Sequence, residues 1–295
     1  MALTPHREKL LAAIENKKAK ADKDILEEAF KAYESWIDQL NALTSKGDER
    51  VIEMTALLNS YKDYLEVDLI AGKGSPFIKR QKGQMKLDNS VMEEFLIHLV
   101  NPAIIEDIPA DIETGSQTAF MSLSFRPTDI ANLSKKPEIV LKKKDQDFTI
   151  GKSIHYKFSP DGDFSTALTE KGKLFLAVFA AEVKVNYDKT MFQECCGTAS
   201  RLKQGCPLSK YYALIEYLDM KAEDVRLTDI DNVFLLRKAK RLPYEKRSDF
   251  NEVKRIHKEF PISSEVMINF VNEMREFVSA TWYDPQQALE RGSFS

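Results

Sequence analysis

The chain has 295 residues, 43% of them hydrophobic, and a formal net charge of −3 at pH 7. The apolar content is enough for a globular core of one large or two small domains. The nearly neutral charge gives no overall attraction to nucleic acid. The first residues lack the apolar stretch of a secretory signal, and no uncharged run approaches the ~18 residues that span a bilayer. These features predict a cytoplasmic protein with no membrane partner.

The first hundred residues show helical periodicity. Apolar residues recur at three-and-four spacing from Ile25 to Leu40, and again within a helix predicted from about residue 48 to 69. A third helix is predicted to begin at the capping residues Asp88-Asn89-Ser90 and to stop at Asn101-Pro102. We therefore expect an N-terminal helical region over residues 1–87 and a core with a C-terminal helix and tail over residues 88–295.

A glycine-containing basic segment without acidic residues precedes the third helix. A second basic group spans Lys142–Lys144, and a third follows a predicted strand. A single basic run is more typical of a solvated face than of a phosphate contact, but three such runs in one chain favour DNA contact. The predicted contacts are Lys73, Lys79, Arg80, Lys82 and Lys86 in the first segment, and Arg237, Lys238, Lys240 and Arg241 in the third.

From about Ala119 the hydrophobic period changes to two, which is typical of strands. Strands are predicted at 119–125, at 147–150 and 153–158 as a hairpin around Gly151-Lys152, and at 174–181, 211–215 and 233–236. Helices are predicted at 190–204 and 266–278. The order of elements predicts an α/β fold, with a mixed sheet core flanked by helices and an N-terminal helical part.

Glu182-Val183-Lys184 lies at the end of the apolar run Leu174–Ala181. Side chains alternate along a strand, so Glu182 and Lys184 share one face while Val183 points to the other. A carboxylate beside a lysine can hold a divalent metal and a phosphate oxygen together, which phosphodiester hydrolysis requires. Taken alone, the tripeptide is more typical of an ion pair at a strand end.

A metal site built on Glu182 needs a second carboxylate on a neighbouring strand. Asp147 opens the predicted strand 147–150, so it can meet Glu182 across the sheet. Asp161 is the competing residue because it follows Pro160, but the segment Ser159–Asp163 has strong turn chemistry. A turn tip is a poor place to fix a metal ligand, which favours Asp147.

Asp147, Glu182 and Lys184 together resemble the acidic residues and lysine of the PD-(D/E)xK nucleases, although Gln146 stands where that family often has proline. The residues around them are similar to type II restriction endonucleases of the BbvCI kind, which read CCTNAGC-like sites with two related subunits. The similar stretches occur in order along the chain, at 145–151, 181–191, 194–203, 230–237, 282–285 and 288–292.

The resemblance implies a restriction-endonuclease-like fold and hydrolysis of double-stranded DNA with Mg²⁺. Asp147 and Glu182, with the carbonyl of Val183, would bind the metal ion, and Lys184 would hold the scissile phosphate or position the attacking water. Glu94 lies where similar subunits have a Glu-Phe pair, so it is a further candidate metal ligand. The alternative for Glu94 is a favourable charge at a helix N-terminus.

Two functional hypotheses remain open from the sequence. The chain is either a restriction endonuclease subunit that cuts one strand, or a DNA-binding subunit that positions another cutting subunit. The complete set of Asp147, Glu182 and Lys184 favours the first hypothesis. A chain with one active centre must pair to break both strands, as a homodimer or as a heterodimer with a related subunit. Base contacts are predicted for Arg80, Gln81 and Gln84.

Overall fold

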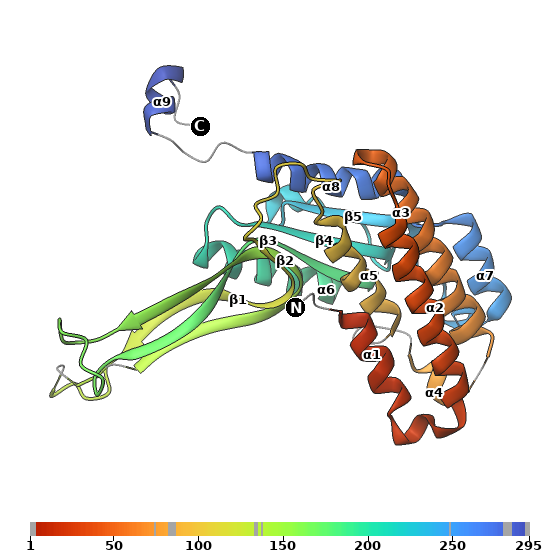
Figure 1. Cartoon of the computed structure of the whole chain (residues 1–295), viewed down its shortest axis with the longest axis horizontal. Coiled ribbons are helices and arrows are strands. Elements are labelled where there is room, and N and C mark those ends of the chain that lie inside the picture. Colours follow the sequence, from red (N-terminus) through yellow and green to blue (C-terminus); the bar gives the residue numbers. More distant parts are fainter. Residues whose placement is uncertain are drawn as a thin grey trace.

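The computed structural model describes residues 4–73, 75–81, 87–132, 135–136, 138–247, 249–279 and 285–292. Helices make up its N-terminal part, which forms the right-hand side of the molecule in Figure 1. In chain order they are α1 (Pro5–Ile14), the 3₁₀ helix η1 (Lys17–Asp22), α2 (Lys23–Ala42), α3 (Gly47–Lys62), the π-helix η2 (Asp63–Ala71), α4 (Pro76–Lys79) and α5 (Leu87–Leu99). The three predicted helices are confirmed as α2, as α3 with η2, and as α5.

The second part of the chain forms a five-stranded sheet in the order β1-β2-β3-β4-β5. The strands are β1 (Glu113–Arg126), β2 (Glu138–Phe158), β3 (Glu170–Tyr187), β4 (Lys210–Leu218) and β5 (Asn232–Lys240). β2 pairs antiparallel with β1 and with β3, whereas β4 pairs parallel with β3 and with β5. A single parallel pair, Ala119 with Phe175, also joins β1 to β3. The predicted mixed sheet is confirmed.

The remaining helices follow β3, β4 or β5 in the chain. They are α6 (Lys189–Gly205), the 3₁₀ helices η3 (Val225–Leu227) and η4 (Tyr244–Lys246), α7 (Phe250–Glu259), α8 (Ser264–Ser279) and α9 (Pro285–Arg291). The predicted helices at 190–204 and 266–278 are confirmed as α6 and α8. Within the described residues, no helix is long and apolar enough to cross a membrane.

The predicted hairpin at Gly151-Lys152 is wrong, because β2 runs through this dipeptide without a turn. The first half of β2 pairs with β1, and its second half pairs with β3. The structure therefore has two ribbons. The first ribbon consists of β1 and the first half of β2, and the second ribbon consists of the second half of β2 and β3. Both extend from the helical body (Figure 1). Gly151 lies at the junction, where an added Cβ would be 2.2 Å from the carbonyl oxygen of Leu176.

A register shift accompanies this junction. Ile150 pairs with Phe179, but Gly151 pairs with Ala177, so Val178 is an extra residue on β3. Such a bulge reverses the alternation of side chains on one strand relative to the other. Ala177 and Ala180 accordingly lie in the same hydrophobic cluster, although three residues separate them.

Two hydrophobic clusters cover the two faces of the sheet. The larger joins the N-terminal helices and α8 to the face that includes Phe179, Ala181 and Val183. The other packs α6 against the face that includes Ala180 and Tyr211. Because Val183 enters the first cluster, its neighbours Glu182 and Lys184 are directed to the opposite face of β3.

Candidate active site

Asp147, Glu182 and Lys184 meet where β2 and β3 pair. Lys184 Nζ lies 2.8 Å from Glu182 Oε1 and 3.5 Å from Asp147 Oδ2. The backbone N–H of Val183 donates to the same Asp147 oxygen at 2.8 Å. The structure thus brings together the three residues that the sequence analysis selected. Asp161 instead lies in the connection between β2 and β3, where its carboxylate accepts bonds from Ser165.

The site is closed around the lysine and open at the aspartate. The side chain of Lys184 is 3% exposed, against 27% for Asp147. Burial and the charges of Glu182 and Glu93 raise the pKa of Asp147 to about 6, although Lys184 and the Val183 N–H oppose this. Burial lowers the pKa of Lys184, but Asp147 and Glu182 outweigh it and leave the pKa raised. The lysine is therefore a stable cation between two crowded carboxylates.

Tyr211 of β4 forms part of the wall behind Glu182. Its hydroxyl donates to Glu182 Oε2 at 3.4 Å, and its side chain is fully buried. Burial and the charge of Glu182 raise the pKa of the Tyr211 phenol, which keeps it a hydrogen-bond donor. No local pattern predicts this contact, because it depends on the parallel pairing of β3 with β4.

The structure does not support Glu94 as a metal ligand. Its Oε2 accepts the backbone N–H groups of His6 and Arg7 at 2.8 and 3.2 Å, and its Oε1 accepts the Tyr33 hydroxyl at 2.6 Å. The carboxylate therefore binds the N-terminus of α1 and is not grouped with Asp147 and Glu182. The charge at a helix N-terminus that the sequence suggested is real, but the helix is α1 and not α5, which carries Glu94.

Glu93 is the α5 residue whose charge reaches Asp147. Asn89 donates to its Oε1 at 2.8 Å, and Lys9 Nζ of α1 lies 3.3 Å from its Oε2. Of the adjacent pair Glu93-Glu94, the sequence favoured Glu94, whereas the charge that acts on Asp147 is that of Glu93. The two side chains diverge by about 100° around a helix of 3.6 residues per turn, and only the packing of α1 on α5 shows which one faces the sheet.

A divalent cation fits the chemistry of this site. Within the described residues, no group of three or more His, Cys, Asp or Glu side chains is arranged to hold a metal ion. Asp147 and Glu182 nevertheless provide carboxylate oxygens, which Mg²⁺ prefers. Their mutual repulsion contributes to the raised pKa of Asp147, and a bound cation would relieve it.

The structure describes only part of the basic segment that contains Lys73, Lys79, Arg80, Lys82 and Lys86. Lys73 pairs with Glu28 of α2 at 2.8 Å between Nζ and Oε2. Lys79 and Arg80 are exposed at the end of α4, and Gln81 is partly exposed. Lys82, Gln84 and Lys86 lie outside the described residues. The proposed DNA contacts of this loop stay predictions.

The third basic group is not a uniform surface. Arg237 is 1% exposed, and its Nε lies 2.8 Å from Glu216 Oε2, so a direct DNA contact for Arg237 is wrong. This arginine belongs to a buried ionic cluster in which Lys62 lies 2.5 Å from Glu66 and 2.7 Å from Glu216. Lys238 is exposed and pairs with Glu265, and Lys240 is exposed.

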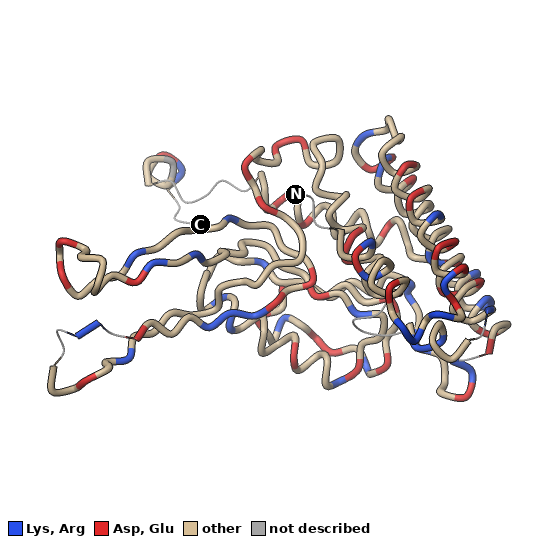
Figure 2. Tube along the Cα trace, turned by 60° about the horizontal axis from the view of Figure 1, so that its bottom comes forward, with Lys and Arg blue, Asp and Glu red and all other residues tan. Residues whose placement is uncertain are grey.

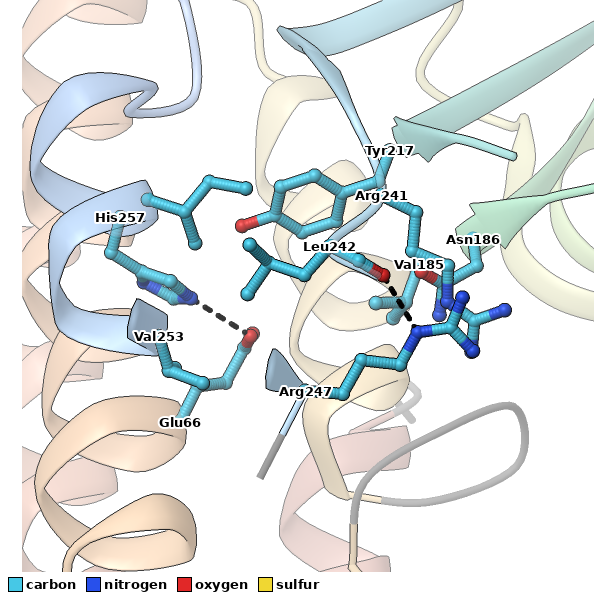
Figure 3. A pocket seen from close by; sticks show the side chains of 10 residues that line it. Glu66, Val185, Asn186, Tyr217, Arg241, Leu242, Arg247, Val253 and His257 are labelled. Carbon is cyan, nitrogen blue, oxygen red and sulfur yellow. Dashed lines mark hydrogen bonds and ion pairs between the residues drawn. The ribbon is translucent and has the colours of Figure 1, made fainter. Parts of the chain in front are cut away.

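Arg241 lines a pocket beside this cluster, and Asp147 is not among the residues that line it (Figure 3). It pairs with Asp219, with 2.7 Å between Nη1 and Oδ2. Figure 3 shows Arg241 and Arg247 on one side of the pocket and the Glu66–His257 pair on the other. The pocket also contains the Tyr217 hydroxyl, which has no hydrogen-bond partner among the described residues. Apart from Arg237, the DNA contacts predicted in this group stay predictions.

The fold is similar to that of a solved restriction endonuclease. A chain of the structure titled "native BbvCI A2B2 tetramer at low resolution" matches with a TM-score of 0.71 and 17% sequence identity. The match covers 96% of this chain and 100% of that chain. With its five-stranded mixed sheet and flanking helices, the protein has a restriction-endonuclease-like fold.

The sequence gives the family. The model of the Bpu10I restriction endonuclease family matches residues 84–294, which is more than half of the chain. The chain therefore belongs to the Bpu10I restriction endonuclease family, which confirms the resemblance to restriction endonucleases and makes the protein a site-specific deoxyribonuclease. No curated protein matches it. The match begins just before α5, so α1 to α4 lie outside the family model.

Proposed function

We propose that the chain is the cutting subunit of a type II restriction endonuclease that hydrolyses one strand of double-stranded DNA at a CCTNAGC-like site with Mg²⁺. The observation that carries the proposal is the contact of Lys184 with both Asp147 and Glu182. A subunit that only positioned DNA would have no chemical need to bury a lysine between two acids. Membership of the Bpu10I restriction endonuclease family supports the reaction class.

Each residue of the site has a separate role in this proposal. Asp147 and Glu182, with the carbonyl of Val183, hold the metal ion, which when bound activates water and neutralises charge on the phosphate. The Lys184 ammonium binds a phosphate oxygen or orients the attacking water, since Asp147 and Glu182 keep it protonated. In-line attack of water on phosphorus then leaves a 5′-phosphate and a 3′-hydroxyl.

Glu93 is the proposed third acid of the site. Its charge already contributes to the raised pKa of Asp147, and its side chain is 10% exposed. Asn89 and Lys9 hold its two oxygens in place. Since Glu93 is fixed on α5 and the other two acids lie on strands, the position of α5 against β2 and β3 sets the geometry of all three.

An assembly of more than one chain is part of the proposal, because one active centre cuts one strand. The similar structure is titled as an A2B2 tetramer, so it contains two kinds of chain. We propose a comparable pairing for this protein, with itself or with a related subunit. The main proposed DNA contacts are Lys79, Arg80, Lys82 and Lys86. Additional proposed contacts are Lys73, Lys238, Lys240 and Arg241.

The test is plasmid cleavage by the purified chain with Mg²⁺. The wild-type chain is expected to nick supercoiled plasmid if it cuts one strand, or to linearise it if it forms a competent homodimer. Glu182→Gln and Lys184→Ala should each abolish the product, while exposed Lys31→Ala should not. Full cleavage by both site variants would overturn the proposed site. Cleavage that requires a second subunit and survives both substitutions would identify this chain as the positioning subunit.

A further inference from the structure

The outer half of the second ribbon carries cations on one face. His155 pairs across the ribbon with Lys173, and Lys157 pairs with Lys171. Side chains of directly paired residues lie on the same face, and residues two apart on one strand share that face. His155, Lys157, Lys171 and Lys173 therefore form a single row, which we call the cationic ladder; all four residues are exposed.

This arrangement is unfavourable for the isolated protein. Like charges directly opposite one another destabilise a pair of strands. Within the described residues, none of the three ladder lysines forms an ion pair, and Lys143 of the first ribbon adds another cation by donating to the carbonyl oxygen of Lys173 at 3.3 Å. The first ribbon shows the usual solution, because Arg126 pairs across it with Glu138 and the two form a salt bridge.

The other face of the second ribbon is bound to the first ribbon. The ring of Phe158 lies 5.4 Å from that of Phe125, and Tyr156 packs beside Phe158 at 5.1 Å. Glu170, the cross-strand partner of Phe158, pairs with Lys136 at 3.3 Å. These contacts fix which face of the outer part of the second ribbon packs on Phe125, and the opposite face carries the ladder. Figure 2 shows lysines and arginines along both ribbons beyond the helical body.

The ladder lies on the same face of β3 as Glu182 and Lys184. Without the extra residue Val178, the odd-numbered Lys171 and Lys173 would face away from the even-numbered Glu182. The bulge brings them to one face, as the shared cluster of Phe175, Ala177 and Ala180 shows, with α6 packed over the stretch between. Nine residues separate Lys173 from Glu182, or on the order of 30 Å along a strand, which is about one turn of B-DNA.

We propose that the cationic ladder binds the phosphate backbone of double-stranded DNA about one helical turn from the bond that is cut. The inference rests on the proposed function, since it assigns the ladder to the same substrate. Duplex DNA is the partner that fits a row of unpaired cations, because it presents regularly spaced negative charge and releases counterions on binding. The ladder consists of positively charged hydrogen-bond donors, which bind phosphate groups but carry no information about base sequence. It therefore positions DNA and does not read sequence.

The experiment compares the full-length wild-type chain with a Lys157→Gln, Lys171→Gln, Lys173→Gln triple variant. Binding to a labelled 40-base-pair duplex is measured without divalent metal over a range of salt concentrations. Three lost phosphate contacts should reduce the slope of log affinity against log salt by roughly 2.7 and lower affinity at least about tenfold at low salt. The matched control is Lys18→Gln, Lys20→Gln, Lys31→Gln, which removes three exposed lysines from η1 and α2 and should leave binding unchanged.

Further measurements separate this inference from the proposed function. The Lys→Arg triple variant should restore binding, and thermal unfolding should show that all variants fold. Plasmid nicking at saturating protein should keep its maximal rate in the Gln triple variant, because the ladder does not touch the reacting phosphate.

Unchanged affinity and an unchanged salt slope in the Gln triple variant would overturn the proposed role of the ladder, even if cleavage is normal. Loss of subunit assembly with normal DNA binding would also overturn it, since the ladder would then contact a partner chain. If the wild-type chain fails to cut, the binding comparison still decides the ladder.

Discussion

The backbone N–H of Val183 donates to Oδ2 of Asp147 at 2.8 Å, so the middle residue of Glu182-Val183-Lys184 holds the acid on the neighbouring strand. Asp147 consequently has one oxygen committed within the protein. An Asp147→Asn substitution can keep this bond through its amide oxygen while removing the charge that a metal ion requires. We expect the variant to fold and to lose at least about a hundredfold in cleavage rate, measured by single-turnover plasmid nicking. Wild-type activity in Asp147→Asn would contradict the assigned site.

The raised pKa of Asp147 predicts an unusual dependence of stability on pH. With a pKa of about 6 in the folded protein against about 3.8 in the unfolded chain, the folded state binds more protons between these values. The contribution of Asp147 to the free energy of unfolding therefore falls as pH rises from about 4 through 6. In metal-free protein this contribution should fall by roughly 2 kcal/mol, measured as the difference between the wild-type chain and Asp147→Asn in urea unfolding at pH 4.5 and 7.5.

The Asp147→Asn variant is the control for this measurement, because the other titrating groups are common to both proteins. His6, whose pKa burial lowers to about 3, acts in the opposite direction over the same range and cancels in the comparison. Addition of Mg²⁺ at pH 7.5 should stabilise the wild-type chain and leave the variant nearly unchanged. Parallel pH profiles of the two proteins would show that Asp147 ionises normally.

Glu93 and Glu94 are adjacent residues with separate expected effects. Glu94→Gln weakens the hydrogen bonds to His6 and Arg7, so it should lower stability by about 1–3 kcal/mol with cleavage near normal well below the melting temperature. Glu93→Gln should keep most of the stability and reduce cleavage, mainly by raising the Mg²⁺ concentration needed. Thermal unfolding and metal titration of nicking distinguish the two. If Glu94→Gln instead raised the Mg²⁺ requirement and Glu93→Gln only lowered stability, Glu94 would be the metal ligand.

The buried ionic cluster predicts a large stability effect far from the chemistry. Burial lowers the pKa of Lys62, but Glu216 and Glu66 outweigh it and leave the pKa raised, so the lysine is charged. Lys62→Met removes the cation that joins these two carboxylates and leaves Arg237 as the remaining cation of the cluster, so it should cost about 3–5 kcal/mol, measured by urea unfolding. Lys31→Met on exposed α2 is the matched control and should change stability by less than about 0.5 kcal/mol. A comparable loss in both would attribute the effect to methionine rather than to the cluster.

The sequence predicted the main elements because their patterns are local. In α2 and α8, apolar residues at three-and-four spacing mark the face of the helix that meets the core. In β3, a continuous apolar run marks a buried strand. Both patterns can be recognised from neighbouring residues alone. The pairing of Asp147 with Glu182 also followed from the sequence, since strand ends and turn residues restricted the choice.

Contacts between distant segments were not predictable in this way. Arg237 looks like the other basic residues around it, but Glu216 on β4 makes it part of the core. Glu94 could be distinguished from Glu93 only after α1, more than eighty positions earlier, had docked on α5. The false hairpin at Gly151-Lys152 has the same origin, because a glycine beside a polar residue is a turn signal unless the surrounding strands continue.

The extra residue Val178 determines which face of the second ribbon carries the lysines. Deleting this one residue would leave every lysine of the second ribbon in the sequence and in a strand, yet would exchange the two sides of β3 from Ala177 outward. Lys171 and Lys173 would then be forced toward the aromatic rings, and Gly172 and Leu174 would face the solvent. Two chains that differ by a single valine could therefore differ in whether they present a positively charged surface at all.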